Sequence, residues 1–277
     1  MLDVQRVVYI AFLCATLIFS NSNLGAKELL LLTEDAPPHM ISGEQANKEV
    51  LILTDDGPPH MIKQTDGGID LDITRAVLQS IGHSVAVFYT PLSRAKKSVE
   101  GKLADVTVPT FYQQDSDNFY LSDPVVHYRP TLFSMSAKAI DMKNMAKLQG
   151  LRLMTFQGAK GYFNQDFLNL TMKNKYREMH DMSVLPELLY KDRADIVVLD
   201  YYIFYYFALE RIDNFSPQLF SHQPLMAEVP AYAGFHSKQL RDEFNKALAV
   251  YLREGKDKAV IRKYLGNNIP IELASNN

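Results

Sequence analysis

Apolar residues follow three patterns along the chain, and the first is a single long run. Val7 to Phe19 holds 13 largely apolar residues directly after Arg6, and small and polar residues follow it. The run is too short to cross a bilayer comfortably, and this layout is typical of a secretory signal peptide. We therefore expect residues 1–26 to be a signal peptide that directs export of the chain. Cys14 lies inside the run without the small residues of a lipoprotein signal before it, so we do not expect it to be lipidated.

The second pattern is a short β-branched run that follows a helical stretch. EGKLADVTVP (Glu100–Pro109) and YKDRADIVVLD (Tyr190–Asp200) both pass through Ala-Asp into such a run. Runs of this kind are typical of strands that are buried on both faces of a parallel sheet. Parallel strands need helical crossovers, for which we predict helices over 92–100, 163–170 and 185–190. Two similar α/β lobes are therefore expected.

The third pattern is an apolar residue every three or four positions, which predicts amphipathic helices. It predicts helices over 69–81, 240–252 and 256–265, and a further helix over 201–211 is expected directly after Asp200. The helix over 201–211 begins with YYIFYYF, and we expect most of these rings to lie in the core.

A direct repeat precedes the first of these helices. KELLLLTEDAPPHM (Lys27–Met40) recurs as KEVLILTDDGPPHM (Lys48–Met61), with ten of fourteen positions identical. Each copy reads as a buried strand that ends in a rigid Pro-Pro turn. Because the second copy leads directly into the helix over 69–81, we expect it to form the first strand of the fold. Residues 27–47 are then a duplicated strand segment.

Composition and charge exclude several classes of protein. With 47% hydrophobic and 22% charged residues, the chain is expected to fold as a globule. Its formal net charge of -3 and the lack of a basic stripe argue against a nucleic-acid partner. Because the single cysteine lies in the signal peptide, we expect neither disulfides nor cysteine metal sites in the mature chain.

The common catalytic motifs are absent from the sequence. It contains no G-x-S-x-G, H-E-x-x-H, P-loop or G-x-G-x-x-G motif, and its seven histidines lack metal-ligand spacing. We therefore expect no catalytic residue, metal or cofactor. His60 follows Pro-Pro at a strand end, where it is either a cleft residue or a turn histidine with a local hydrogen bond. We favour the turn histidine.

Acidic residues at the ends of predicted strands are the main binding candidates. Asp200 ends a predicted parallel strand, where α/β folds place ligands, and it could pair with the ammonium group of a solute. It could also cap the helix over 201–211, and the two roles are compatible. Asp55 and Asp56 form either an acid/base pair or turn caps, of which caps are the more common.

A glycine-rich turn is a weaker candidate. FQGAKG (Phe156–Gly161) connects a predicted strand with a predicted helix, and its backbone N–H groups could bind an anion at Gly158. Lys160 would add positive charge there, although a lone loop lysine is usually only solvated.

The order of these pieces from Glu49 to Gly266 resembles the type II periplasmic solute-binding proteins of ABC importers. The branch is the bacterial extracellular solute-binding protein family 3, which binds polar amino acids. The matching pieces are LILTDDGPPHM, GGIDLDI, EGKLADV, YLSDPV, LQGLRLMTFQGA, RADIVVLD and LRDEFNKALAVYLREGKDKAVIRKYLG. The resemblance implies an α/β fold of two lobes, each a mainly parallel sheet flanked by helices, joined by two hinge strands. It places lobe 1 at residues 48–128 and 230–277, and lobe 2 at residues 129–229.

The resemblance also implies a ligand site between the lobes. The positions that match the ligand contacts of the family are Asp55, Leu92, Thr110, Tyr112, Gly158 and Asp200. Asp200 matches the carboxylate that pairs with the ammonium group of an amino acid. We add Lys160 from the glycine-rich turn, and Arg94 as a cation near the start of a helix beside the cleft.

Three departures from the family pattern put an ordinary amino-acid ligand in question. Gly57 stands where the family has an aromatic residue before Pro-Pro. The segment TFYQQDSDN (Thr110–Asn118) lacks the arginine that clamps a carboxylate, and Arg94 is the candidate that could replace this cation. Ala159 and Lys160 replace the threonines of the second lobe.

The function that we expect is solute capture without catalysis. A monomer would hold a small polar or amine-bearing solute between its lobes and present it to ABC permease subunits in the membrane. Two alternatives stay open. The first is a cleft enzyme on the same scaffold, such as a dehydratase, which would need a carboxylate with a raised pKa. The second is a ligand-sensing accessory module for another membrane partner.

Overall fold

The structure is a computed structural model that describes residues 48–112 and 114–271. The expected signal peptide and the first copy of the repeat lie outside these residues. We use lobe 1 for residues 48–128 and 229–271, and lobe 2 for residues 129–228. In the described part of the chain, no helix is both long enough and apolar enough to cross a bilayer.

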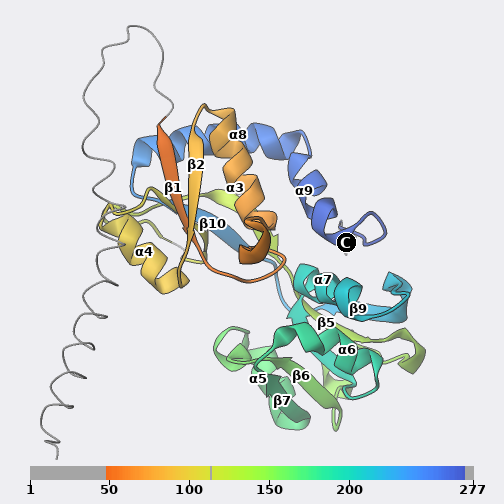
Figure 1. The fold of residues 1–277 in the computed structure, drawn as a ribbon. Helices are drawn as coiled ribbons and strands as arrows, with labels where there is room; N and C mark the ends of the chain where they lie inside the picture. The colour runs from red at the N-terminus through yellow and green to blue at the C-terminus, as the bar shows by residue number, and fades with distance from the viewer. Residues whose placement is uncertain (1–47, 113, 272–277) are drawn as a thin grey trace, which may run out of the picture. The chain divides into compact units, whose positions relative to one another are not determined.

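Each lobe is built on one five-stranded sheet (Figure 1). The sheet of lobe 1 has the order β2-β1-β3-β10-β4, formed by β1 (Glu49–Thr54), β2 (Ser84–Tyr89), β3 (Val106–Thr110), β4 (Tyr120–Tyr128) and β10 (Val229–Phe235). The strand β1 pairs in parallel with β2 and β3, whereas β10 runs antiparallel to β3 and β4. Four strands therefore share one direction and one strand is reversed.

The sheet of lobe 2 repeats this plan. Its order is β7-β6-β8-β5-β9, formed by β5 (Pro130–Met135), β6 (Arg152–Phe156), β7 (Lys175–Met179), β8 (Ile196–Asp200) and β9 (Phe220–Pro224). The strand β6 pairs in parallel with β7 and β8, and β5 is the reversed strand. The chain crosses between the sheets from β4 to β5 and from β9 to β10. The expected α/β fold of two lobes is confirmed.

Alternating side chains explain why each sheet is covered on both faces. In lobe 2, Ile196 and Val198 of β8 pack into one apolar cluster, while Val197 and Leu199 pack into another. All five residues of β3 and all five of β8 are buried. Both strands are therefore central, as the unbroken apolar runs predict.

The helices lie close to their predicted positions. They are α3 (Ile69–Ser80), α4 (Leu92–Glu100), α5 (Gln165–Lys173), α6 (Leu185–Tyr190), α7 (Tyr201–Arg211), α8 (Lys238–Arg253) and α9 (Lys256–Leu265). The helix α5 begins later than predicted because Asn164 caps it by accepting a hydrogen bond from Phe167 N. In lobe 1, α3 packs with α8 and α9, while α4 packs against β1, β3 and β10 (Figure 1).

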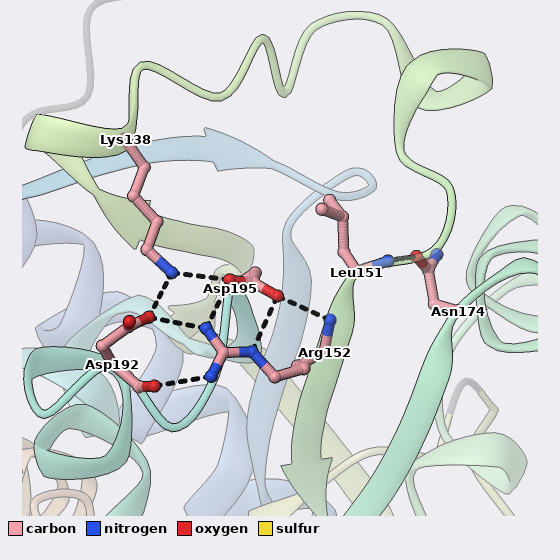
Figure 2. Close-up of polar contacts among 6 residues, drawn as sticks. All are labelled: Lys138, Leu151, Arg152, Asn174, Asp192 and Asp195. Carbon is pink, nitrogen blue, oxygen red and sulfur yellow. Dashed lines mark hydrogen bonds and ion pairs between the residues drawn. The ribbon is translucent and has the colours of Figure 1, made fainter.

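A charged cluster in lobe 2 lies at the start of β6 and β8. It consists of Lys138, Arg152, Asp192 and Asp195. Arg152 of β6 donates from Nε to Asp195 Oδ2 at 2.9 Å and from Nη2 to Asp192 Oδ1 at 2.5 Å (Figure 2). Lys138 Nζ donates to both carboxylates, each at 2.5 Å. Asp195 Oδ2 also accepts the backbone N–H of Arg152 at 2.8 Å. The cluster thus joins the segment before β8 to the first residue of β6.

Candidate functional site

The site begins at the turn that follows β1. Asp55 Oδ2 accepts a hydrogen bond from Leu92 N at the start of α4, and Asp56 Oδ1 accepts one from Lys63 N. Both aspartates therefore act as turn caps, in agreement with the more common of their two expected roles. The turn then passes through Pro58 and Pro59 to His60, whose side chain is 1% exposed.

Gly68 allows the start of α3 to lie directly against this turn. Its φ is 122°, and a Cβ atom there would lie 2.4 Å from the carbonyl oxygen of His60. The backbone of α3 then pairs with the turn, since Ile69 N donates to Pro59 O at 2.8 Å and Asp70 N donates to His60 O at 3.0 Å. This pairing places the Asp70 carboxylate beside the imidazole of His60.

His60 lies between two carboxylates that come from different lobes. Its Nδ1 is 2.7 Å from Asp70 Oδ1 in lobe 1, and its Nε2 is 3.4 Å from Asp200 Oδ1 in lobe 2. Tyr128 at the end of β4 stacks on the imidazole, with ring centroids 3.8 Å apart, and donates its hydroxyl to Asp70 Oδ2 at 3.1 Å. His60 is therefore fixed within lobe 1 by Asp70 and Tyr128, and its ion pair with Asp200 links it to lobe 2.

The charge on His60 follows from these neighbours. Burial alone would lower the pKa of His60, but the negative charges and hydrogen bonds of Asp70 and Asp200 outweigh it and raise the pKa to about 9. At neutral pH the side chain is therefore an imidazolium. Burial, reinforced by the charge of Asp70, raises the pKa of Tyr128 well above its ordinary value, so this phenol stays neutral.

Asp200 is held by the backbone of its own lobe. Its Oδ1 caps α7 by accepting from Tyr202 N at 2.8 Å and Ile203 N at 3.0 Å. Its Oδ2 accepts from Arg129 N at 2.5 Å, at the crossing from β4 to β5. The expected N-cap role is therefore present, and the carboxylate makes contacts with three backbone N–H groups and with His60.

A cavity of about 200 Å³ lies against His60 and Asp200. Residues of both lobes line it, and nearly all of them are apolar or aromatic: Gly57, Pro58, Met61, Leu92, Pro109, Phe111, Tyr128, Pro130, Phe156, Tyr162, Phe163, Met182, Leu199 and Ile203. Tyr162 contributes a hydroxyl whose pKa is raised to about 12 by burial and by the charge of Asp200. The cavity is thus mainly apolar, and the charged side chains in its wall are His60 and Asp200.

Comparison with solved structures places this arrangement in a known fold. The ancestral cationic amino acid solute-binding protein AncCDT-1, a precursor of cyclohexadienyl dehydratase, matches with a TM-score of 0.65 at 17% identity, over 78% of this chain and 95% of that chain. The substrate-binding domain 2 of Lactococcus lactis GlnP matches with a TM-score of 0.60 at 18% identity, over 82% and 99%. A histidine kinase sensor domain with similarity to periplasmic binding proteins matches with a TM-score of 0.56 at 15% identity, over 82% and 100%.

The fold is that of the type II periplasmic solute-binding proteins. Neither a family model nor a curated protein matches the sequence. The solved structures therefore carry the comparison, and the resemblance drawn from the sequence is confirmed at the level of the fold.

Eight residues were predicted from the sequence to bind a ligand, and two of them, Leu92 and Asp200, line the cavity. Asp55 lies one hydrogen bond away, since it accepts from Leu92 N at 3.3 Å. Asp55 and Leu92 belong to lobe 1 and Asp200 to the end of β8 in lobe 2, so the fold brings residues of both lobes together at the cavity. Their contact with a ligand stays a prediction.

The other five predicted residues lie outside the cavity wall. Arg94 is exposed on α4, and Thr110 is buried at the end of β3. Tyr112 is 50% exposed and lies beneath the ammonium group of Lys96. Gly158 N donates to Glu178 Oε2 at 2.9 Å, so its N–H already has an anionic partner, and Lys160 Nζ lies 4.9 Å from the ring centre of Tyr176.

The sequence interpretation missed the polar centre of the site. We expected His60 to be a turn histidine with a local hydrogen bond, and this prediction was wrong, because its side chain pairs with residues 10 and 140 positions away. Asp70 and Tyr128 were not singled out either. The available signal was the run from the Pro-Pro-His turn to Gly-Gly-Ile-Asp, in which a glycine pair brings an acidic residue back toward a histidine.

Proposed function

We propose that the protein is a periplasmic solute-binding protein that captures a small solute between its lobes and delivers it to an ABC importer. The observation that carries the proposal is a cavity with walls from both lobes, at Leu92 and Phe111 on one side and Phe156 and Ile203 on the other. A solute in such a cavity contacts both lobes only when they are closed, so binding shifts the population toward the closed state. Structural neighbours that are substrate-binding parts of amino acid ABC transporters, from Streptococcus pneumoniae and Streptococcus thermophilus, support the permease partner.

The chemical nature of the solute is a separate question. The family resemblance favours a polar or amine-bearing solute paired with Asp200, whereas the lining of the cavity is almost entirely apolar. The capture function itself does not depend on which of the two is correct.

The test of capture is lobe closure. Solutes are screened by the increase that they cause in the thermal unfolding midpoint, which follows from binding to the folded state. Small-angle X-ray scattering is then recorded with and without each solute that binds. We expect the radius of gyration to decrease on binding, and an unchanged radius with every binding solute would contradict the proposal.

A second candidate is an enzyme on the same scaffold. The observation that favours it is His60, a protonated histidine beside an apolar cavity, in a chain with a dehydratase precursor among its structural neighbours. A general acid must reach the leaving group of the substrate, and both nitrogens of His60 already face carboxylates. Recovery of the bound solute unchanged after prolonged incubation would exclude turnover of that solute, and appearance of a product would favour the enzyme.

A third candidate is a sensory module, supported by the neighbour from a histidine kinase. It would use the same capture and closure. A permease gene beside the gene of this protein would favour import, whereas a membrane kinase gene there would favour sensing.

A further inference from the structure

The carboxylate that would receive a solute ammonium already has a cation of its own chain. His60 Nε2 faces Asp200 Oδ1 at 3.4 Å, and the other carboxylate of the cluster, Asp70, faces His60 Nδ1 at 2.7 Å. Both nitrogens of the imidazolium are therefore directed at carboxylates. An added ammonium group would have to compete with His60 for Asp200.

The charges of the cluster balance without a ligand. The two carboxylates contribute two negative charges and the imidazolium one positive charge. Asp200 caps α7, and Asp70 lies in the first turn of α3. A helix N-terminus acts as about half a positive charge, so the two helices offset the remaining negative charge. Neither a cationic nor an anionic solute is needed to neutralise the site.

The size and lining of the cavity indicate what fits against this balanced cluster. In another protein a dry cavity of about 150 Å³ lined by Leu, Ile and Phe holds benzene. At about 200 Å³, this cavity has room for one ring with a short substituent. Phe111, Phe156, Tyr162 and Phe163 line it, and aromatic edges and faces of this kind pack well against a ring.

We propose that the cavity selects a small neutral solute with one ring, and that His60 is the residue that excludes ammonium-bearing solutes by occupying Asp200 with its imidazolium. This inference rests on the proposed capture function and narrows its solute class. It replaces the polar or amine-bearing solute that the family resemblance implies.

Three probes of nearly equal size separate the solute classes: benzyl alcohol is neutral, benzylamine is a cation at pH 7 and benzoate is an anion. We expect isothermal titration calorimetry to show benzyl alcohol binding at least about tenfold more tightly than either charged probe, a difference of about 1.4 kcal/mol. Benzylamine or benzoate binding as tightly as benzyl alcohol would overturn the proposal, as would the failure of all three to bind.

Two variants assign the selectivity to this cavity. His60→Gln removes the positive charge that faces Asp200, and we expect it to reverse the order so that benzylamine binds more tightly than benzyl alcohol. Leu92→Trp fills the cavity from the half-buried start of α4 and should abolish binding of benzyl alcohol. Leu103→Trp is the matched control, because Leu103 is 59% exposed and does not line the cavity.

The outcomes separate this inference from the capture function. If Leu92→Trp binds benzyl alcohol like the unmodified protein, the cavity assignment is wrong, and this holds even where His60→Gln does not fold. If a polar amino acid binds and closes the lobes in scattering while the ring probes do not bind, the solute class is wrong and the capture function stands. If binding solutes leave the radius of gyration unchanged, the capture function itself fails.

Discussion

Asp200 combines a structural role with a place in the wall of the cavity. Its carboxylate caps α7, receives the backbone N–H of Arg129 at the lobe crossing and faces His60. Each of these contacts fixes the carboxylate in one orientation. The carboxylate of Asp200 is therefore preorganised, and its cationic partner is His60 of the same chain.

The contribution of Asp200 to the free energy of unfolding can be separated from that of a helix cap alone. Asp200→Ala removes the cap of α7 and also leaves His60 with one carboxylate and Arg129 N without its partner. A cap alone is worth about 1 kcal/mol, and the loss of a buried hydrogen bond to a charged group costs about 1.5–3 kcal/mol more. We expect urea denaturation to show a loss of about 3 kcal/mol for Asp200→Ala.

Asn164→Ala is the control for the cap alone, because Asn164 caps α5 through Phe167 N and contacts no charged group in this role. We expect it to cost about 1 kcal/mol. Equal losses for the two variants would show that the contacts of Asp200 with His60 and Arg129 contribute nothing to stability.

At the scale of elements, the charged cluster of lobe 2 holds two strands in place. Asp195 is 17% exposed, and the hydrogen bond from Arg152 is the first of several contacts that hold its pKa well below the ordinary value of 3.8. A lowered carboxylate pKa contributes stability at neutral pH that is lost as the pH falls below about 4. Asp195→Asn should therefore lower the free energy of unfolding at pH 7, and the difference from the unmodified protein should shrink toward pH 3.

The control for this cluster is Asp141→Asn. Asp141 is 53% exposed and faces Lys147 at 3.4 Å, an arrangement typical of surface ion pairs that contribute little. Urea denaturation between pH 3 and pH 7 gives both results. A loss for Asp195→Asn that is as small as that for Asp141→Asn would show that the cluster in Figure 2 does not stabilise the start of β6 and β8.

Elements were predictable from the sequence because their signals are local. The apolar runs of β3 and β8 and the periodic apolar positions of α3, α8 and α9 each lie within a short stretch of sequence, and the observed helices begin and end at or near the predicted positions. The core of the site was not predictable in this way. His60 and Asp200 are 140 residues apart, and their pairing depends on two lobes meeting. Family positions such as Tyr112 and Gly158 do not line the cavity, and here they contact Lys96 and Glu178.

At the scale of the whole molecule, the two lobes share a plan and a core. Both sheets have three parallel neighbours at one edge and the reversed strand next to last. One apolar cluster contains residues of lobe 1, such as Ile73 and Phe244, and residues of lobe 2, such as Phe204. The lobes are therefore joined by apolar packing as well as by the link from His60 to Asp200.

This link makes the stability of the molecule depend on pH in a defined direction. The pKa of His60 is raised from 6.5 to about 9, so the folded chain holds a proton that the unfolded chain releases earlier. The stabilisation is fully present below pH 6.5 and is lost as the pH rises through about 9. By linkage it amounts to roughly 3 kcal/mol. The groups that face the imidazolium are Asp70 from α3, Asp200 from the end of β8 and the phenol of Tyr128 from β4.

Urea denaturation at intervals from pH 6 to pH 9.5 measures this dependence. We expect the free energy of unfolding to fall steadily across the window in the unmodified protein and to stay nearly level in His60→Gln. His222 does not mimic the effect, because burial lowers its pKa and its contribution to stability is therefore lost below pH 6.5 rather than above it. A free energy that is level or rising from pH 6.5 to pH 9 in the unmodified protein would mean that His60 is not held as an imidazolium, and the charge balance at the cavity would have to be rejected with it.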